Sequence, residues 1–150
     1  MNIDQLIDQQ LQDGKMMQLA TSLKDQPWCC TVYFVANENK DIYWISKPNR
    51  RHSQEIMKNP KASATVPTKF VPGQSIAALQ VEGEASLVED SEEIKIVITS
   101  YENRFNRGQE WLEDFLNGNN EHKLYKIVPS LIAVCDEEAF PEELIREWRA

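Results

Sequence analysis

The sequence has few cysteines, and none is spaced for a structural metal site. Only Cys29, Cys30 and Cys135 occur in 150 residues. The first two are adjacent in an apolar run typical of a strand, so their side chains should point to opposite faces. Zinc sites use closely spaced pairs of Cys or His ligands, and only His52 and His122 could join these cysteines. We therefore expect reduced thiols and no bound metal.

Long apolar runs and an excess of positive charge are also absent. No stretch approaches the roughly 20 apolar residues that cross a bilayer, and residues 1–14 lack the basic and apolar regions of a secretion signal. Lys and Arg number 16 against 24 Asp and Glu, which gives a formal net charge of -8. Broad nucleic-acid or membrane surfaces need the opposite balance. We expect a cytoplasmic protein that binds neither nucleic acid nor membranes.

The familiar phosphate-binding and hydrolase motifs are missing as well. The chain contains no GxGxxG, no GxxxxGK[ST] and no GxSxG. Strand-like runs are separated by helical patterns at only some connections, which argues against a doubly wound nucleotide-binding fold. Any bound anion would therefore have to be held by side chains.

The chain is large enough for one sizeable hydrophobic core. Its 150 residues are 41% hydrophobic and 27% charged, without a repeat or a long linker. This composition predicts a single domain over residues 1–150.

The first third of the sequence predicts a helix followed by an antiparallel meander. Asn2 can cap the helix and Gly14 can end it. Four apolar residues share one helical face: Ile3, Leu6, Ile7 and Leu11. Three strand-like runs follow, at residues 15–22, 28–36 and 41–46. The polar segments between them are short enough for hairpins.

The middle of the sequence predicts one short helix and two more strands. Residues 51–59 can form one or two helical turns before Pro60, with Ile56 and Met57 directed inward. Residues 62–66 are typical of a fourth strand. Residues 77–89 are typical of a long fifth strand, in which Gly83 marks a bulge or bend.

The last third predicts helices around one more strand. Residues 90–93 resemble a capping box before a helix, and Trp111 begins a further helical piece that ends at residues 117–120. A final strand over 122–136 should be interrupted at Pro129, and a C-terminal helix should start at Pro141. The whole pattern predicts a mainly β fold with helices (α+β). We expect an antiparallel barrel with helices at the N-terminus, after the fifth strand and at the C-terminus.

One cationic segment stands out in this acidic chain. Lys47, Arg50, Arg51 and His52 follow a strand-like run and contain no acidic residue among them. Two guanidinium groups and an imidazole at the start of a short helix suit a phosphate monoester. The alternative is that Arg50 and Arg51 are solvated loop residues paired with nearby carboxylates.

The order of motifs from residue 15 to residue 136 resembles a known family. The motifs are Leu19-Ala20-Thr21, Pro27, residues 32–35, residues 42–46, Arg50 to His52, Asn59-Pro60, and ALQVEGEASLVED at residues 78–90. In this order and spacing, the chain is similar to the pyridoxamine 5'-phosphate oxidase-like FMN-binding split barrels.

The resemblance implies a split β-barrel with FMN as cofactor. It places Arg50, Arg51 and His52 on the flavin phosphate, with His52 at a position where the family commonly has Lys. That replacement implies a phosphate affinity that depends on pH near neutrality. It implies a homodimer with two equivalent sites at the subunit interface and Gln80 near the flavin. Six strand residues match segments that line the flavin ring: Thr31, Val32, Tyr33, Trp44, Ile45 and Ser46.

Several of these residues have a structural alternative. Tyr33 and Trp44 could equally be barrel core, where strand aromatics usually lie. Arg104 is expected to be exposed on a helix end that serves packing or acts as a lid. Trp111 could pack in the core or reach the cofactor of a neighbouring subunit.

The function implied by the resemblance is an FMN-dependent oxidoreductase of unknown substrate. Vitamin B6 phosphate is not expected as the substrate, because the chain ends in FPEELIREWRA and lacks the family's Arg-Leu-rich closing motif. One alternative is a haem or deazaflavin protein on the same scaffold, for which His52 and His122 are the available haem ligands. Another is a non-catalytic ligand-sensing or interaction protein.

Overall fold

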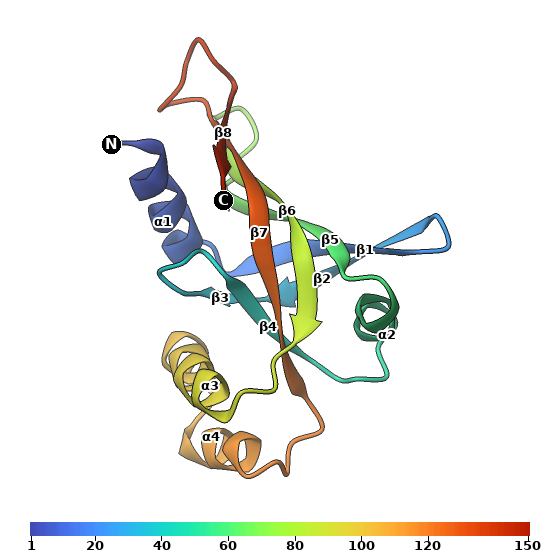
Figure 1. Ribbon diagram of the computed structural model, residues 1–150. Helices are drawn as coiled ribbons and strands as arrows, with labels where there is room; N and C mark the ends of the chain where they lie inside the picture. Colours follow the sequence, from blue (N-terminus) through green and yellow to red (C-terminus); the bar gives the residue numbers. More distant parts are fainter.

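The computed structural model describes all 150 residues, which form four helices and eight strands (Figure 1). The elements are α1 (Ile3–Asp13), β1 (Met16–Leu23), β2 (Gln26–Tyr33), β3 (Val35–Ala36), β4 (Ile42–Ser46), α2 (Arg51–Lys58), β5 (Lys61–Lys69), β6 (Ala77–Leu87), α3 (Ser91–Phe105), α4 (Gln109–Leu116), β7 (Lys123–Asp136) and β8 (Ile145–Arg149). No helix is long and apolar enough to cross a membrane.

The strands form one curled antiparallel sheet. Its order is β2-β1-β5-β6-β7-β4-β3, and β8 pairs with β7 off this path. β7 is long enough to pair with β4 through residues 123–127 and with β8 through residues 131–135. The sheet therefore curls into a half-barrel, which confirms the predicted α+β split barrel.

The two short hairpins form as the polar turns predict. β1 and β2 pair in register from Met16 to Leu23 around Lys24 and Asp25, which both have positive φ angles. Positive φ at both central residues is the conformation that fits the twist of a two-residue hairpin. In the β3–β4 hairpin, the Asn37 side chain accepts hydrogen bonds from the turn backbone.

Gly83 permits a register shift between β6 and β7. A Cβ at this position would lie 2.2 Å from the carbonyl oxygen of Val128, so only glycine fits without moving the backbone. The shift falls between Glu82 and Gly83, where Gly83 pairs with Pro129. The predicted bulge is confirmed. The predicted interruption of the last strand at Pro129 is wrong. The register shift lies at Pro129, but β7 continues through it from Lys123 to Asp136.

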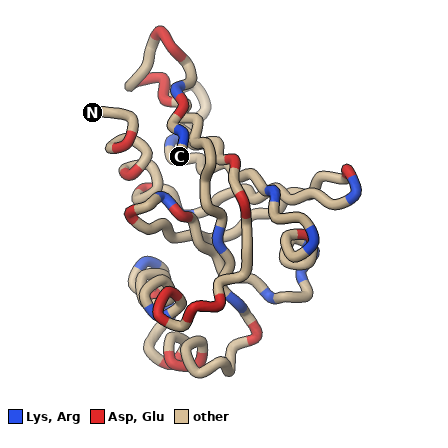
Figure 2. The backbone as a smooth tube through the Cα atoms, viewed as in Figure 1, with Lys and Arg blue, Asp and Glu red and all other residues tan.

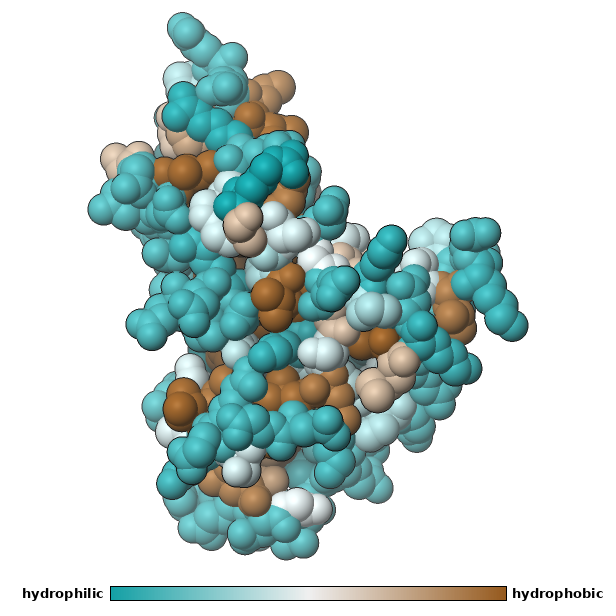
Figure 3. Space-filling model, in the orientation of Figure 1, coloured by the Kyte–Doolittle hydropathy of each residue, from teal (hydrophilic) through white to brown (hydrophobic).

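Two hydrophobic clusters lie on opposite sides of the sheet. The larger one fills the half-barrel and is covered by Leu6, Ile7 and Leu11 of α1. The smaller one joins α3 and α4 to β3, β4 and β7. Viewed as in Figure 1, the surface is mostly hydrophilic, with hydrophobic side chains in separate patches (Figure 3).

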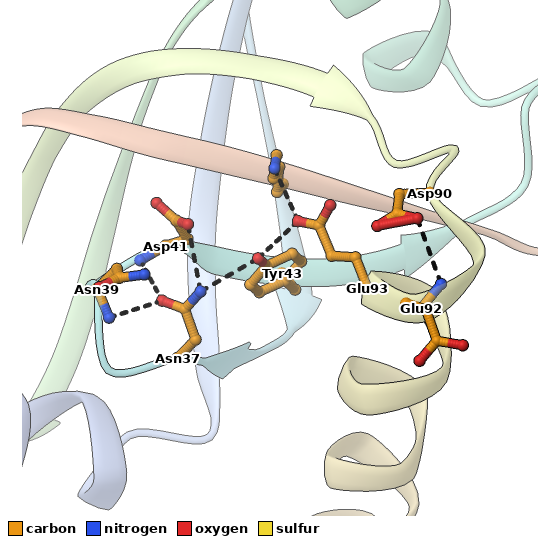
Figure 4. A network of polar contacts seen from close by, with 8 residues as sticks. Asn37, Asn39, Asp41, Tyr43, Asp90, Glu92 and Glu93 are labelled. Atoms are coloured by element: carbon orange, nitrogen blue, oxygen red, sulfur yellow. Dashed lines mark hydrogen bonds and ion pairs between the residues drawn. The ribbon is translucent and has the colours of Figure 1, made fainter.

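A polar network ties the start of α3 to the β3–β4 hairpin (Figure 4). The Tyr43 hydroxyl donates to Glu93 at 2.8 Å and accepts from the Asn37 amide at 3.2 Å. Lys126 also donates to Glu93, at 2.7 Å, and this hydrogen bond lowers the pKa of Glu93. The side chain expected to complete a capping box therefore binds the sheet instead, and Asp90 alone caps α3.

Three details differ from the sequence predictions. The predicted C-terminal helix is wrong. Residues 145–149 form a strand that pairs with residues 131–135 of β7, beyond the part of β7 that pairs with β4. Ile56 is buried as expected, but Met57 is 63% exposed. Arg104 is not an exposed residue: its guanidinium donates to the carbonyls of Leu11 and Gln12 at the end of α1.

Candidate functional site

A cavity of about 680 Å³ lies between β2, the end of β4 and the α3–α4 unit. The apolar residues of α3 and α4 pack on the outer face of the sheet, and Arg107 in the turn between these helices lines the same cavity as Ile45 and Ser46 at the end of β4. Strand residues Thr31, Val32, Ile45 and Ser46 line one side. The cavity therefore combines a strand floor with a helical wall.

One end of the cavity is cationic. Figure 2 shows Lys and Arg residues along the segment from β4 to α2. Arg50 is the exposed N-cap residue of α2, and its guanidinium forms no ion pair. No side chain caps α2, so the backbone N–H groups of its first turn have no side-chain acceptor. Lys47 lies at the same end, paired with Glu121 at 2.8 Å. Together these groups suit an anion.

His52 lies inside this cationic end and is buried. Its Nε2 is 2.6 Å from the Ser46 hydroxyl. Burial lowers the pKa of His52 below its ordinary value of 6.5, and the nearby Arg50 lowers the pKa further. The imidazole is therefore mostly neutral at pH 7, and Ser46 fixes its orientation.

Arg51 does not line the cavity. Its Nε donates to Glu55 at 2.9 Å, and its guanidinium lies 4.2 Å from the centre of the Trp28 ring. Glu55 is buried and also accepts a hydrogen bond from the Thr21 hydroxyl. Arg50 precedes the helix in extended backbone, whereas Arg51 is the first helical residue and its side chain lies on Glu55 one turn further on, so Arg51 leaves the cavity that Arg50 and His52 line. Of the three residues predicted to hold phosphate, the structure brings two together.

The aromatic residues divide between wall and core. Tyr33 lines the cavity and is 51% exposed. Trp44 has no exposed surface and stacks on Tyr125 inside the half-barrel. For Trp44 the core interpretation is therefore correct, and its side chain is not part of the cavity wall. Alternation along β4 explains the burial of Trp44, because Trp44 and Ile45 point to opposite faces of this strand and only Ile45 lines the cavity.

The helical wall supplies Tyr101 and Arg107, which the sequence prediction did not assign to the site, and Trp111, which it placed either in the core or at the cofactor of a neighbouring subunit. Tyr101 stacks on Trp111 at 5.7 Å, and the guanidinium of Arg107 lies 5.5 Å from the Trp111 ring. Burial raises the pKa of Tyr101 to about 12, so its hydroxyl stays protonated. The Arg107-Gly108 pair between two predicted helices was the available signal for a cationic turn.

His122 also lines the cavity, although its position after a polar turn favours a surface residue. Its Nδ1 lies 2.9 Å from the Asn120 side-chain oxygen. Partial burial lowers the pKa of His122, and the charges of Lys47 and Arg107 lower it further. The ring is therefore held in place and is mostly neutral at pH 7.

Gln80 lies outside the cavity. It is exposed on β6, opposite Thr65 of β5 in the sheet register. Within one chain it therefore does not meet the other nine residues predicted for the cofactor.

Comparison with known proteins connects this fold to one family. A family model described as pyridoxamine 5'-phosphate oxidase matches residues 3–132. UPF0306 proteins of Yersinia pestis are 27% identical over 84 residues, which are 55% of this chain, and the match spans only 57% of the length of these relatives.

Three solved structures share the architecture. A candidate pyridoxamine 5'-phosphate oxidase from Listeria innocua has 24% identity and a TM-score of 0.67, covering 89% of this chain and 98% of that one. HutZ, the haem storage protein of Vibrio cholerae, has 23% identity and a TM-score of 0.67, covering 86% and 91%. An FAD-binding protein from Mesorhizobium loti has 16% identity and a TM-score of 0.66, covering 89% and 94%. At these identities the likeness concerns the fold.

Proposed function

Because the chain belongs to the pyridoxamine 5'-phosphate oxidase family, we propose that its cavity binds FMN and that the protein is an oxidoreductase. The observation that carries this proposal is the pairing of a cationic end with an aromatic wall in one cavity. An FAD-binding protein among the structural neighbours adds support for a flavin.

The residues of the cavity fit the two parts of FMN. Arg50 and the uncapped first turn of α2 would hold the phosphate through charged and backbone donors. His52, oriented by Ser46, would add a further donor. Tyr33 and Trp111 offer apolar surface for a planar ring. When bound, the flavin supplies hydride or electron transfer, while the protein supplies position and electrostatics.

We also propose that the working unit is a homodimer. β2 is an edge strand of the sheet, and it carries exposed Trp28 and Tyr33, with exposed Met16 opposite Tyr33 on β1. Tyr33 and Met16 also line the cavity, so a second copy lying on β2 would cover the flavin. A flavin contact with Gln80 then requires the sheet of the partner, because Gln80 lies outside the cavity of its own chain.

Haem is a second candidate ligand, favoured by one observation at His122. The Nδ1 of this imidazole is held by Asn120, while Nε2 has no hydrogen-bond partner and the residue lines the cavity. His52 is less suitable as an axial ligand, because Ser46 already engages its Nε2. A Soret band on haem addition that is lost in His122→Ala but kept in His52→Ala would favour haem.

Titration of the purified protein with FMN and with riboflavin tests the flavin proposal. Flavin fluorescence and absorbance measure binding. We expect FMN to bind at least about tenfold more tightly than riboflavin, because each charged hydrogen bond to phosphate contributes about 1.5–3 kcal/mol. Equal affinity for the two would remove the phosphate site. Binding of neither would remove the flavin.

A further inference from the structure

A second groove lies on the other side of the segment that joins β4 to α2. Its volume is about 510 Å³, within the range of small-molecule sites. Figure 1 shows α2 beside the C-terminal end of β6. We call it the α2 groove, and its lining residues are Pro48, Gln54, Met57, Lys58, Leu87, Lys123 and Tyr125.

The walls of the α2 groove follow from the geometry of its elements. Gln54, Met57 and Lys58 are three and four residues apart, so they share one face of α2. Lys123 and Tyr125 are two residues apart on β7, and Leu87 of β6 is paired with Tyr125. The groove therefore has a helical wall and a strand wall.

Charge in the α2 groove is of one sign. Lys58 lies on the helical wall and Lys123 on the strand wall, and neither forms an ion pair within the chain. No Asp or Glu lines the groove. In a chain of formal net charge -8, two unpaired ammonium groups beside one hollow favour an anion.

The Tyr125 hydroxyl adds a neutral hydrogen-bond donor to the α2 groove. Tyr125 is 2% exposed and its ring stacks on Trp44 in the core. Its hydroxyl forms no hydrogen bond within the chain and is accessible at the groove, so it is free to donate to a ligand. The hydroxyl belongs to a residue that lines the groove, so an acceptor placed there would satisfy it.

Apolar surface completes the α2 groove. Met57 is 63% exposed, although it lies on a short helix whose neighbouring residue Ile56 is buried. Leu87 and Pro48 add further apolar lining. Methionine adapts its shape to varied ligands. We propose that the α2 groove binds a small amphipathic carboxylate, with the apolar body on Met57 and Leu87 and the carboxylate on Lys58, Lys123 and Tyr125.

Methionine-methyl NMR of the full chain separates this site from the cavity. The chain has four methionines, Met1, Met16, Met17 and Met57. Met57 lines the α2 groove, Met16 lines the cavity, and Met17 is buried in the core. Titration with octanoate should shift the Met57 signal and leave Met16 unchanged. A shift of Met16 alone, or no shift at millimolar octanoate, would overturn the proposal.

Two further probes separate charge from apolar contact. Octanamide has the same apolar body without the charge and should bind about tenfold more weakly, because it loses two exposed ion pairs. Acetate keeps the charge without the apolar body and should leave Met57 unshifted. Octanamide binding as tightly as octanoate would contradict the role of the lysines.

Substitutions of the lining residues test where the carboxylate of octanoate binds in the α2 groove. Lys58→Gln and Lys123→Gln should each weaken octanoate about threefold to fivefold, the range of an exposed ion pair. Tyr125→Phe should weaken octanoate while the protein stays folded. Lys95→Gln is the matched control, because Lys95 is exposed on α3 and outside the α2 groove. An equal loss in Lys95→Gln would indicate a non-specific charge effect and overturn the assignment. The result does not depend on flavin, since FMN binding is followed at Met16.

Discussion

Arg50 and Arg51 are adjacent in the sequence and lie in different surroundings. Arg50 lines the cavity without an ion-pair partner, whereas Arg51 is bonded to Glu55. We expect Arg50→Gln to raise the Kd for FMN about 10- to 100-fold, the effect of losing one charged hydrogen bond. Fluorescence titration measures the change.

Arg51→Gln should show the opposite profile. It removes the main cause of the low pKa of Glu55, the hydrogen bond from Arg51, and leaves this buried carboxylate with Thr21 alone. We expect a loss of about 1–3 kcal/mol in the free energy of unfolding, with FMN affinity within about threefold of wild type. Urea unfolding measures the stability. A Kd raised as strongly as in Arg50→Gln would place Arg51 on the phosphate.

Two histidines should make the stability of the ligand-free protein depend on pH. Burial lowers the pKa of His52 and of His122 below 6.5, so the unfolded chain takes up protons at a higher pH than the folded chain does. The free energy of unfolding should therefore fall as the pH drops below about 6.5, and the loss is complete below the folded-state pKa values. Urea unfolding from about pH 8 to about pH 5.5 measures this slope.

Glutamine at either histidine tests the origin of that slope. Glutamine does not titrate, so His52→Gln and His122→Gln should each flatten the dependence of stability on pH. A slope unchanged in the double variant would assign the effect to other groups.

The sequence predicted the cationic end of the cavity at the level of a segment and not of single side chains. Lys47, Arg50 and His52 were found because positive charge after a strand is visible in the sequence. The direction of Arg51 depends on Glu55 and Trp28, which meet it only in the folded chain. Trp44 and Tyr33 are both aromatic residues in strand-like runs. Which of them is buried depends on the face of its strand and on the position of that strand in the sheet, and neither is visible in the sequence.

At the scale of elements, the bulge at Gly83 sets the register between β6 and β7. A methyl group there would meet the Val128 carbonyl oxygen at 2.2 Å, and backbone atoms cannot move aside at low cost. We expect Gly83→Ala to lower the free energy of unfolding by about 1–3 kcal/mol, as overpacking does. Ser86→Ala, at an exposed position of β6, should change it by less than about 0.5 kcal/mol. An equally small change in the free energy of unfolding for the two variants would mean that the backbone at the bulge moves to accept a side chain.

Most elements were predictable because their patterns were long and periodic. The hairpins, α2 and α3 lie close to their predicted positions. The tail was assigned to a helix on Pro141, a local signal. It forms β8 instead, because β4 pairs only with residues 123–127 of β7. The backbone groups of residues 131–135 are therefore free to pair with the tail, which is distant from most of the chain in sequence. Sequence patterns do not show where a neighbouring strand stops.

At the scale of the whole molecule, β2 is an uncovered sheet edge with apolar side chains. Exposed edges of this kind pair with other chains unless they are blocked. We therefore expect the protein to sediment at twice its chain mass of 17.3 kDa. Trp28→Asp places a charge at this edge and should shift the protein toward monomer. Analytical ultracentrifugation measures the equilibrium.

Ile96→Asp controls for the loss of any exposed apolar residue. Ile96 is 69% exposed near the start of α3, whereas α3 meets β2 at its other end through Phe105 and Tyr33, so its replacement should leave the dimer intact. If a second copy covers the cavity, Trp28→Asp should also weaken FMN binding in proportion to the monomer formed, because Met16 and Tyr33 would lose their cover. A wild-type protein that stays monomeric and binds FMN tightly would mean that one chain is a complete site.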